Sequence, residues 1–288
     1  MSIVKKILSV FAVAFMAVST AQAGVIKFGV TDITGLESLQ TEYGDFVKAL
    51  EDVTGDTVKF FPVNSRTAAV EALANGHVDY ILTGPAEYIV FRARAKAVPV
   101  VAWQRLDYFT QIVTLNGNGV TTIDDLKGKK VAFGDVGSTS THLGPAQLFA
   151  SAGLMPGKDF EALNIHRNVA VEALIQGNID AFAVGSSHLV NIRAKFPGAG
   201  LRVAGRGPDL PNDVLVAGAH VASGDVDKIR KAFVDNAKKL MSAAIKGEEN
   251  KKYIGGAFIP NVSDADYEYV RQAYITVGAK NLAKFIDE

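Results

Sequence analysis

The sequence has no cysteine, no net charge and, after its first 23 residues, no long apolar run. Without cysteine there is no disulfide, no thiolate metal ligand and no cysteine nucleophile. The 30 basic and 30 acidic residues balance, which argues against a nucleic-acid-binding protein with a basic face. With 48% hydrophobic residues, the 288-residue chain is long and apolar enough to bury a core, so it is not a disordered chain.

The first 23 residues have the pattern of an export signal. Lys5 and Lys6 precede a 12-residue apolar run at 7–18, and Ala21-Gln22-Ala23 has the small residues of a cleavage site. The run is too short for a transmembrane helix, which needs about 20 apolar residues. Cleavage before Gly24 would leave 265 residues with 28 basic and 30 acidic side chains. Because Gly24 offers no cysteine for a lipid anchor, we expect a freely diffusing periplasmic protein.

The rest of the chain alternates segments of strand and helix pattern. This order predicts an α/β fold with mostly parallel sheets and helices on both faces. The first helix is expected at 36–53. Strands are expected at 25–30, 57–63, 79–82, 98–103, 111–115, 130–133, 179–184, 201–204 and 214–217.

One 16-residue element occurs twice. Residues 69–84 and 170–185 are identical at eight of 16 positions, and each copy has the pattern of a helix, a terminating glycine and a strand opened by aspartate. Two copies predict two similar lobes. The mainly helical segment that follows is too short for a third lobe but can complete the first. We therefore expect lobe one at 24–112 and 216–288, lobe two at 113–215, and a ligand cleft between them.

The strongest local signal of a binding site is a row of hydroxyl residues at an expected helix start. Ser138, Thr139 and Ser140 follow the strand at 130–133 and Gly137. Free N–H groups and the helix dipole allow the start of a helix to bind an anion, and the hydroxyls add further hydrogen-bond donors. One hydroxyl would suffice as a plain helix cap, so three favour a site for a tetrahedral oxyanion.

Motifs of other chemistry are absent from the sequence. It has no P-loop, no G-x-G-x-x-G and no G-x-S-x-G. The five histidines lack zinc-like spacing, so we expect neither a metal nor a cofactor. One alternative is a periplasmic hydrolase, for which His142, four residues after Ser138, is the sole sequence-local base. His166 precedes the helix of the second copy of the repeated element and should point into the cleft.

The export signal, the repeated element and the Gly137-Ser138-Thr139-Ser140 turn together resemble the phosphonate-, phosphite- and phosphate-binding proteins of ABC importers. The segments Gly84-Pro85…Tyr88 and Pro211-Asn212-Asp213 are further specific parts of the resemblance. It implies a type II periplasmic binding-protein fold, a non-enzymatic role, a small oxyanion ligand and a permease partner in the inner membrane. A monomer is expected for a receptor that closes on its ligand.

The resemblance also assigns residues to the ligand site. The expected ligand-binding positions are Ser138, Thr139, Ser140, Tyr108, His166, Arg66 and Asp213. Further positions expected to line the cleft are Thr83, Tyr88 and Ser186. Among these, the carboxylate of Asp213 favours a ligand oxyanion that keeps one proton.

Two positions depart from the pattern of aminophosphonate-binding members of the family. Arg66 stands where they commonly have a tyrosine, and Ser186 where they have a second carboxylate for the ligand's amine. A guanidinium suits bidentate contact with an oxyanion, and loss of the carboxylate removes half of an ammonium site. The expected ligand is therefore phosphate, phosphite or a simple alkylphosphonate rather than aminoethylphosphonate. Another alternative is the same fold as the sensing partner of a membrane histidine kinase, with a ligand such as arsenate.

Overall fold

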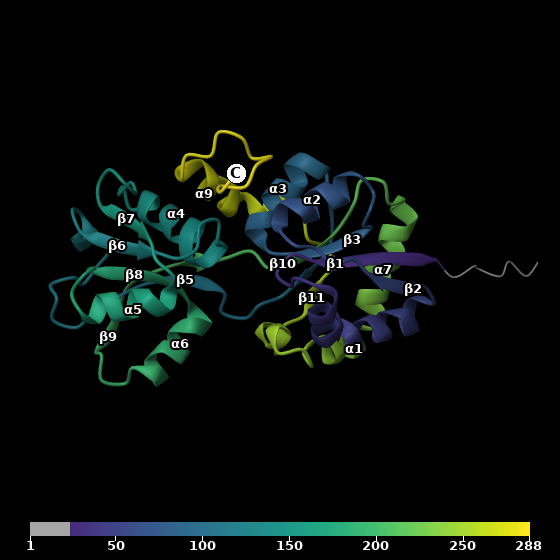
Figure 1. The fold of residues 1–288 in the computed structure, drawn as a ribbon, viewed down its shortest axis with the longest axis horizontal. Coiled ribbons are helices and arrows are strands. Elements are labelled where there is room, and N and C mark those ends of the chain that lie inside the picture. The colour runs from purple at the N-terminus through teal and green to yellow at the C-terminus, as the bar shows by residue number, and fades with distance from the viewer. Residues whose placement is uncertain (1–23) are drawn as a thin grey trace, which may run out of the picture.

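The computed structural model describes residues 24–288, and the expected export signal at 1–23 lies outside the described residues. Two lobes lie end to end, each built on one sheet flanked by helices (Figure 1). The chain crosses between the two sheets at residues 104–108 and again at 210–212. Within 24–288, no helix is long and apolar enough to cross a membrane.

Lobe one contains a six-stranded sheet in the order β11-β4-β10-β3-β1-β2. Its strands are β1 (Val25–Val30), β2 (Thr57–Phe60), β3 (Tyr80–Thr83), β4 (Val98–Trp103), β10 (Asp213–Ala217) and β11 (Phe258–Ile259). One face packs against α1 (Leu36–Thr54), α7 (Ser223–Asp235) and α8 (Ala237–Ala244). The other face packs against α2 (Arg66–Ala74), α3 (Pro85–Ala95) and α9 (Glu268–Thr276).

Lobe two contains a five-stranded sheet in the order β7-β6-β8-β5-β9. Its strands are β5 (Phe109–Leu115), β6 (Lys130–Phe133), β7 (Glu161–Asn164), β8 (Ala181–Gly185) and β9 (Leu201–Asp209). One face packs against α4 (Gly144–Ser151), which a π-helical turn, η2 (Thr139–Leu143), precedes. The other face packs against α5 (Arg167–Ile175) and α6 (Ser186–Lys195).

Both sheets are mixed, whereas the alternating pattern predicted mostly parallel ones. The neighbours of β1 and β6 in the first part of each lobe run parallel to them. In contrast, β5 and β10, which follow the two crossings, run antiparallel to theirs. The reason is that β1 and β3 end at the junction of the lobes, whereas β10 starts there. Sheet pairing also moves the expected boundaries: residues 109–112 belong to the second sheet and 213–215 to the first.

The repeated element has the same structural role in both lobes. The glycine after each helix has a positive φ, 72° in the first copy and 76° in the second, as expected of a glycine that ends a helix. Asp79 Oδ2 accepts the N–H of Lys27 at 2.7 Å, and Asp180 Oδ2 accepts the N–H of Lys130 at 2.9 Å. Each aspartate therefore ties its strand to the start of the parallel neighbour.

Trp103, the one tryptophan of the chain, lies in an apolar strand and is fully buried in lobe one. The rings of Phe46, Tyr253 and Phe258 meet it edge-on with centroids 5.1, 5.2 and 5.0 Å away. Such aromatic packing adds to the stabilisation from burial. The fluorescence of Trp103 should therefore report the unfolding of this lobe.

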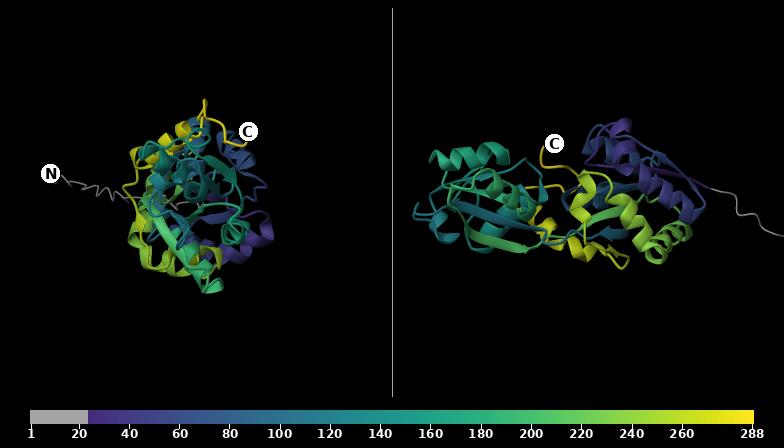
Figure 2. Two further views of the ribbon diagram at one scale, coloured as in Figure 1. Left: turned by 90° about the vertical axis from the view of Figure 1, so that its left-hand side faces the viewer. Right: turned by 90° about the horizontal axis from the view of Figure 1, so that it is seen from below.

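The lobes touch in this conformation. The chain returns to the junction in its C-terminal segment, where α9 lies beside lobe two (Figure 2). The hydroxyl of Tyr269 donates to the carbonyl of Gly144 at 3.3 Å, and Thr276 Oγ1 donates to Gln147 Oε1 at 2.6 Å. Leu143 of lobe two is fully buried among side chains of lobe one. These contacts place η2 and the start of α4 directly against lobe one.

Candidate ligand-binding cleft

A cleft of about 330 Å³ lies between the lobes. Lobe one lines it with Asp32, Arg66, Gly84, Pro85, Glu87 and Asp213, the first crossing with Arg105 and Tyr108, and lobe two with Asp135, Val136, Ser138, Thr139 and Ser140. This volume is near the lower end of the range for small-molecule sites, so the cleft suits a small ligand.

Three helices begin at the cleft. Arg66 is the first residue of α2, Pro85 the first of α3, and Thr139 the first of η2, which continues into α4. The first turn of a helix carries N–H groups without intrahelical partners and a partial positive charge. Both lobes therefore direct the anion-binding ends of helices at the same space.

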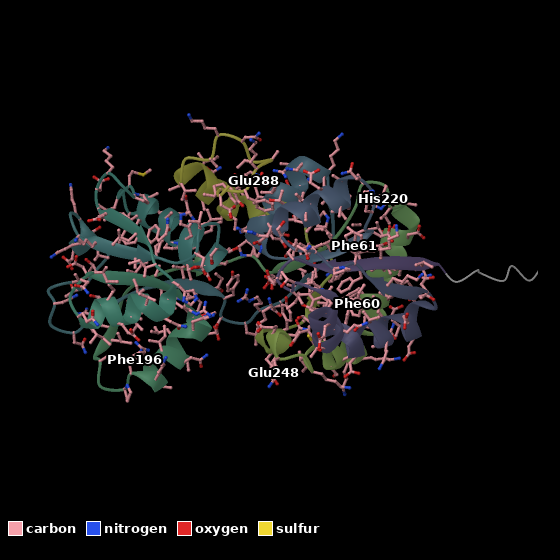
Figure 3. The ribbon with its side chains drawn as sticks, viewed as in Figure 1. Phe60, Phe61, Phe196, His220, Glu248 and Glu288 are labelled. Atoms are coloured by element: carbon pink, nitrogen blue, oxygen red, sulfur yellow. The ribbon has the colours of Figure 1, made fainter. Side chains whose placement is uncertain are left out.

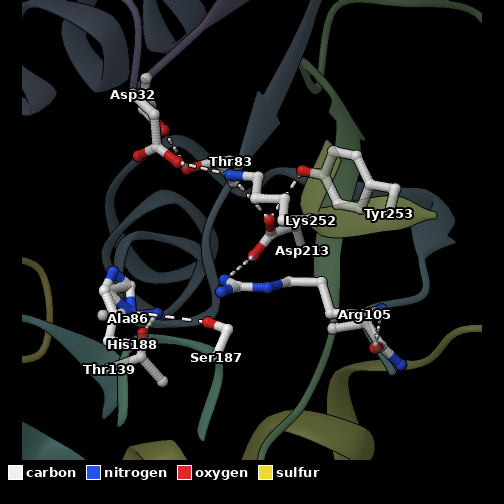
Figure 4. Close-up of polar contacts among 12 residues, drawn as sticks. Asp32, Thr83, Ala86, Arg105, Thr139, Ser187, His188, Asp213, Lys252 and Tyr253 are labelled. Carbon is white, nitrogen blue, oxygen red and sulfur yellow. Dashed lines mark hydrogen bonds and ion pairs between the residues drawn. The ribbon is translucent and has the colours of Figure 1, made fainter. Parts of the chain in front are cut away.

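The hydroxyl turn predicted from the sequence forms the lobe-two wall of the cleft. Thr139 Oγ1 accepts the backbone N–H of Ala86 at 3.1 Å, which links this wall to the first turn of α3 (Figure 4). The Thr110 hydroxyl donates to the carbonyl of Ser140 at 2.8 Å and fixes the turn from behind. Because the Thr139 oxygen acts as an acceptor toward Ala86, its own hydrogen can be donated elsewhere.

Arg66 faces the cleft and reaches the backbone of lobe two. Gly137 has a φ of 82°, the left-handed region that favours glycine, and a Cβ there would lie 2.9 Å from Nη1 of Arg66. The guanidinium also pairs with Glu87 at 3.3 Å and with Asp287 of the C-terminal tail at 3.0 Å. A glycine at position 137 is therefore needed both for the turn and for the approach of Arg66.

Asp213 is the buried centre of a charge cluster in the cleft wall (Figure 4). The Tyr253 hydroxyl donates to its Oδ2 at 2.7 Å, Lys252 Nζ lies 3.3 Å from the same oxygen, and Arg105 Nη1 lies 3.5 Å from Oδ1. Lys252 also pairs with Asp32 at 3.1 Å. Burial works to raise the pKa of Asp213, but Lys252 and Arg105 outweigh it and hold that pKa below its ordinary value.

Arg105 stacks on Tyr108, the aromatic residue predicted for the crossing. The guanidinium carbon lies 3.6 Å from the centre of the ring. Burial raises the pKa of the Tyr108 hydroxyl, so it stays protonated at neutral pH and can donate a hydrogen bond.

Sequence reasoning missed Arg105, although an arginine three residues before the expected tyrosine was a usable signal. It also missed Lys252, which no local pattern connects with Asp213.

Glu87 is a half-buried carboxyl in the first turn of α3. Burial, and then the nearby Asp32, raise the pKa of Glu87 to about 7, against the lowering effect of Arg66. The carboxyl is therefore half protonated near neutral pH, and in its protonated form it can donate a hydrogen bond. Sequence reasoning did not single out this residue.

Two predicted site residues of lobe two lie outside the cleft lining. His166 is the exposed N-cap of α5, and its Nδ1 accepts the N–H of Asn168 at 3.5 Å, so it does not point into the cleft as expected. The hydroxyl of Ser186 donates to the carbonyl of Asp107 in the crossing segment. Both side chains are used to fix local backbone.

Two predicted cleft residues of lobe one are also turned away from it. Tyr88 is fully buried, its hydroxyl donates to Asp264 Oδ1 at 2.9 Å, and its ring packs on Tyr267 with centroids 4.2 Å apart. Thr83 is buried and its hydroxyl lies 3.1 Å from that of Thr31. The helical turn that follows Gly84 directs Tyr88 into the core rather than toward the ligand space.

The geometry does not support a hydrolase. His142 Nδ1 accepts the backbone N–H of Gly137 at 3.2 Å, and burial lowers the pKa of the imidazole. The ring therefore supports the turn instead of activating the Ser138 hydroxyl. Among residues 24–288, no group of three or more histidine, aspartate or glutamate side chains is placed to hold a metal ion.

Comparison with known proteins identifies the family. Residues 28–267 match the periplasmic substrate-binding proteins of phosphonate ABC transporters. The chain belongs to this family. It is a substrate-binding protein of an importer and not an enzyme, and its role implies a small ligand and a permease partner.

Individual relatives agree with this identification. The phosphate-import protein of Mycolicibacterium smegmatis is 24% identical over 273 residues, which cover 84% of this chain and 82% of that protein. A binding component of a phosphonate ABC transporter from Pseudomonas aeruginosa has a TM-score of 0.62 at 20% identity, covering 93% of this chain and 92% of that one. A Prochlorococcus marinus protein solved with methylphosphonate has a TM-score of 0.59 at 20% identity, covering 88% and 98%. At these identities the two solved structures establish the shared type II periplasmic binding-protein fold.

Proposed function

We propose that the cleft binds a small phosphorus oxyanion, namely phosphate, phosphite or a simple alkylphosphonate. The observation that carries this proposal is the hydroxyl turn at 138–140, which opposes the N-terminus of α3 across the cleft. Arg66 and Arg105 line the same space. Hydroxyls, the positive ends of the helices and two guanidinium groups converge on this space, as the oxygens of a tetrahedral anion require.

The two lobes supply different parts of this site. The hydroxyl turn of lobe two binds the anion through Ser138, Thr139 and Ser140. On the opposite side, the site is completed by Arg66 of lobe one and Tyr108 of the first crossing. Because Asp213 already has protein partners on both oxygens, we assign it the positioning of Arg105 rather than direct contact with the ligand. Contacts from both lobes are available only when the cleft is closed, so the ligand stabilises the closed form that the permease would receive.

The carboxylates of the cleft restrict the charge of the ligand. Asp32 and Asp213 form ion pairs with Lys252 and Arg105, whereas Asp135 is in none of the ion pairs found within 24–288. A dianion would meet residual negative charge, so we propose that a singly charged oxyanion is preferred. In its protonated form Glu87 adds no negative charge to the cleft and can donate to a ligand oxygen.

A thermal-shift screen tests the proposed ligand class. The panel is phosphate, phosphite, methylphosphonate, aminoethylphosphonate and sulfate. At a concentration 100 times the dissociation constant, a ligand stabilises the folded protein by about 2.7 kcal/mol. For a chain of this size we expect a rise in Tm of about 5 °C with at least one of the first three compounds. A rise with sulfate alone, or with none of the panel, would contradict the proposal.

Replacement of Glu87 by glutamine should remove one component of the pH dependence of binding. If the ligand needs the protonated carboxyl, ionisation of Glu87 weakens wild-type binding above its pKa of about 7, by about tenfold at pH 8. The amide cannot ionise, so Glu87→Gln should lose less affinity between pH 6 and pH 8. Calorimetry at both pH values measures this difference, and the ionisation of the ligand cancels because it is common to both proteins. Identical profiles would exclude Glu87 from the ligand site.

A further inference from the structure

A second pocket, of about 260 Å³, lies in lobe two between α5 and α6. This α5–α6 pocket is lined by Arg167, Asn168, Val171, His188, Asn191, Ile192, Lys195 and Phe196. Val171 and Ile192 are buried and form an apolar floor. Phe196, just after the end of α6, lies at the outer side of the lobe (Figure 3). The pocket is therefore smaller than the cleft and separate from it, and its size suits only a ligand of a few atoms.

The side chains around the pocket are basic. Arg167, His188 and Lys195 line it, and no aspartate or glutamate does. None of the ion pairs found within 24–288 uses Arg167 or Lys195. The cleft differs in this respect, because four carboxylates line it. An unneutralised group of cations around a concave surface attracts small anions.

The start of α5 adds to this positive charge. Arg167 and Asn168 are the first two residues of α5, so the positive end of its dipole lies beside the pocket. The pocket extends along α6 from His188 to Lys195, its last residue, so α6 contributes side chains rather than a helix end. The amides of Asn168 and Asn191 provide further donors at its edge. Cations, amides and one helix start thus line the same space.

His188 connects the pocket with the cleft. A Cβ placed on Gly185 would lie 3.8 Å from Nδ1 of His188 and 3.2 Å from Oγ of Ser140, so imidazole and hydroxyl flank the same backbone position. The Ser187 hydroxyl lies 3.5 Å from the same ring nitrogen (Figure 4). The imidazole therefore stands between the wall of the cleft and the α5–α6 pocket.

The protonation of His188 should respond to an anion in the pocket. Burial, then the charges of Arg167 and Arg105 and the neighbouring His166, lower the pKa of His188 to about 4. The ring is therefore uncharged at neutral pH. A bound anion would offset the surrounding cations and raise this pKa.

We propose that the α5–α6 pocket is a second anion site, which binds a small oxyanion through Arg167, Lys195 and the asparagine amides. The ligand class is that of sulfate, phosphate and the carboxylate of small organic acids. This site does not depend on the identity of the cleft ligand. An anion there would lie close to His188 and oppose the binding of a second anion in the cleft, and by linkage the effect is reciprocal.

Histidine NMR tests this site, with sulfate as the probe and the ionic strength held constant with sodium chloride. The ring signals of His188 are assigned by their loss in His188→Gln. In the wild-type protein, sulfate should shift these signals in a saturable way and raise the pKa of His188 by about one unit. Arg167→Gln combined with Lys195→Gln should weaken this binding at least about tenfold, because two charged donors are lost. Arg193→Gln, on α6 but outside the pocket lining, is the matched control and should bind like wild type.

A cleft variant distinguishes the two sites. Ser138→Ala combined with Thr139→Val should leave the sulfate titration of His188 unchanged, even if it abolishes binding of phosphorus oxyanions in the cleft. The proposal is overturned if sulfate gives no saturable shift of His188. It is also overturned if the shift survives in the Arg167→Gln and Lys195→Gln variant but is lost in the cleft variant, because the ion would then lie in the cleft.

Discussion

Ser138→Ala combined with Thr139→Val should weaken binding of the phosphorus oxyanion roughly 100-fold. Each hydroxyl that donates to a charged ligand contributes about 1.5–3 kcal/mol, and 1.4 kcal/mol corresponds to a factor of ten. Valine retains the shape of threonine, so the packing of the turn is kept. The Ala86 N–H loses its acceptor in this variant, which removes the hydrogen bond between the lobes as well. Calorimetry with the strongest ligand of the screen measures the loss.

Two further variants separate ligand contact from lobe closure. Ser138→Ala alone keeps the bond between Ala86 and Thr139, so its effect reflects contact with the ligand. Ser151→Ala removes a hydroxyl at the far end of α4, where it donates to the carbonyl of Gln147, and should bind like wild type. If the double variant keeps wild-type affinity, the anion is not seated on the hydroxyl turn.

Asp213→Asn should lower the free energy of unfolding by about 3 kcal/mol or more. The carboxylate is 2% exposed and compensates the positive charges of Lys252 and Arg105. The amide removes this charge, so Lys252 keeps its ion pair with Asp32 but loses the one with Asp213, and Arg105 loses its ion pair. Removal of one member of a buried ion pair typically costs about 3–5 kcal/mol. Urea unfolding followed by Trp103 fluorescence measures the change, because that residue is buried in the same lobe.

The control and the pH dependence of this effect follow from the same contacts. Asp209→Asn breaks an exposed pair with Arg206 and should leave stability nearly unchanged. The pKa of Asp213 is lowered in the folded protein, so its contribution is fully present above the unfolded-state value of about 3.9 and is lost as the pH falls through the folded-state pKa. The two proteins should therefore differ by a constant amount at pH 5–8 and converge in stronger acid. Equal stability at pH 7 would show that the cluster does not need the carboxylate.

The parts of the fold that depend on local pattern were predictable from the sequence. The strands at 98–103 and 130–133 have the predicted bounds, because apolar runs with clear ends determine them. The glycines of the repeat adopt the expected positive φ for an equally local reason. The sheet membership of 109–112 and 213–215 was not predictable in this way, because it depends on which strands pair after the chain crosses between lobes.

In the candidate site, too, the residues placed by local pattern were predictable and those placed by tertiary contacts were not. The hydroxyl turn lines the cleft because a strand followed by glycine and a helix start fixes its position in the fold. His166 and Tyr88 were misplaced because a helix cap in one case and a core contact in the other decide where the side chain points. Lys252 reaches Asp213 from a distant short helical turn, and only the tertiary structure brings the two together.

Calorimetric titration of the wild-type protein with phosphate, phosphite and methylphosphonate tests whether the cleft binds a phosphorus oxyanion. At least one of these compounds should bind at one cleft site per chain with a dissociation constant below about 1 mM, and Ser138→Ala combined with Thr139→Val should weaken binding at that site. The affinity for this compound should be higher at pH 6 than at pH 8, because Glu87 has a pKa of about 7 and is mostly ionised at pH 8. No measurable binding of any of the three at either pH would contradict the assignment of the cleft to a phosphorus oxyanion.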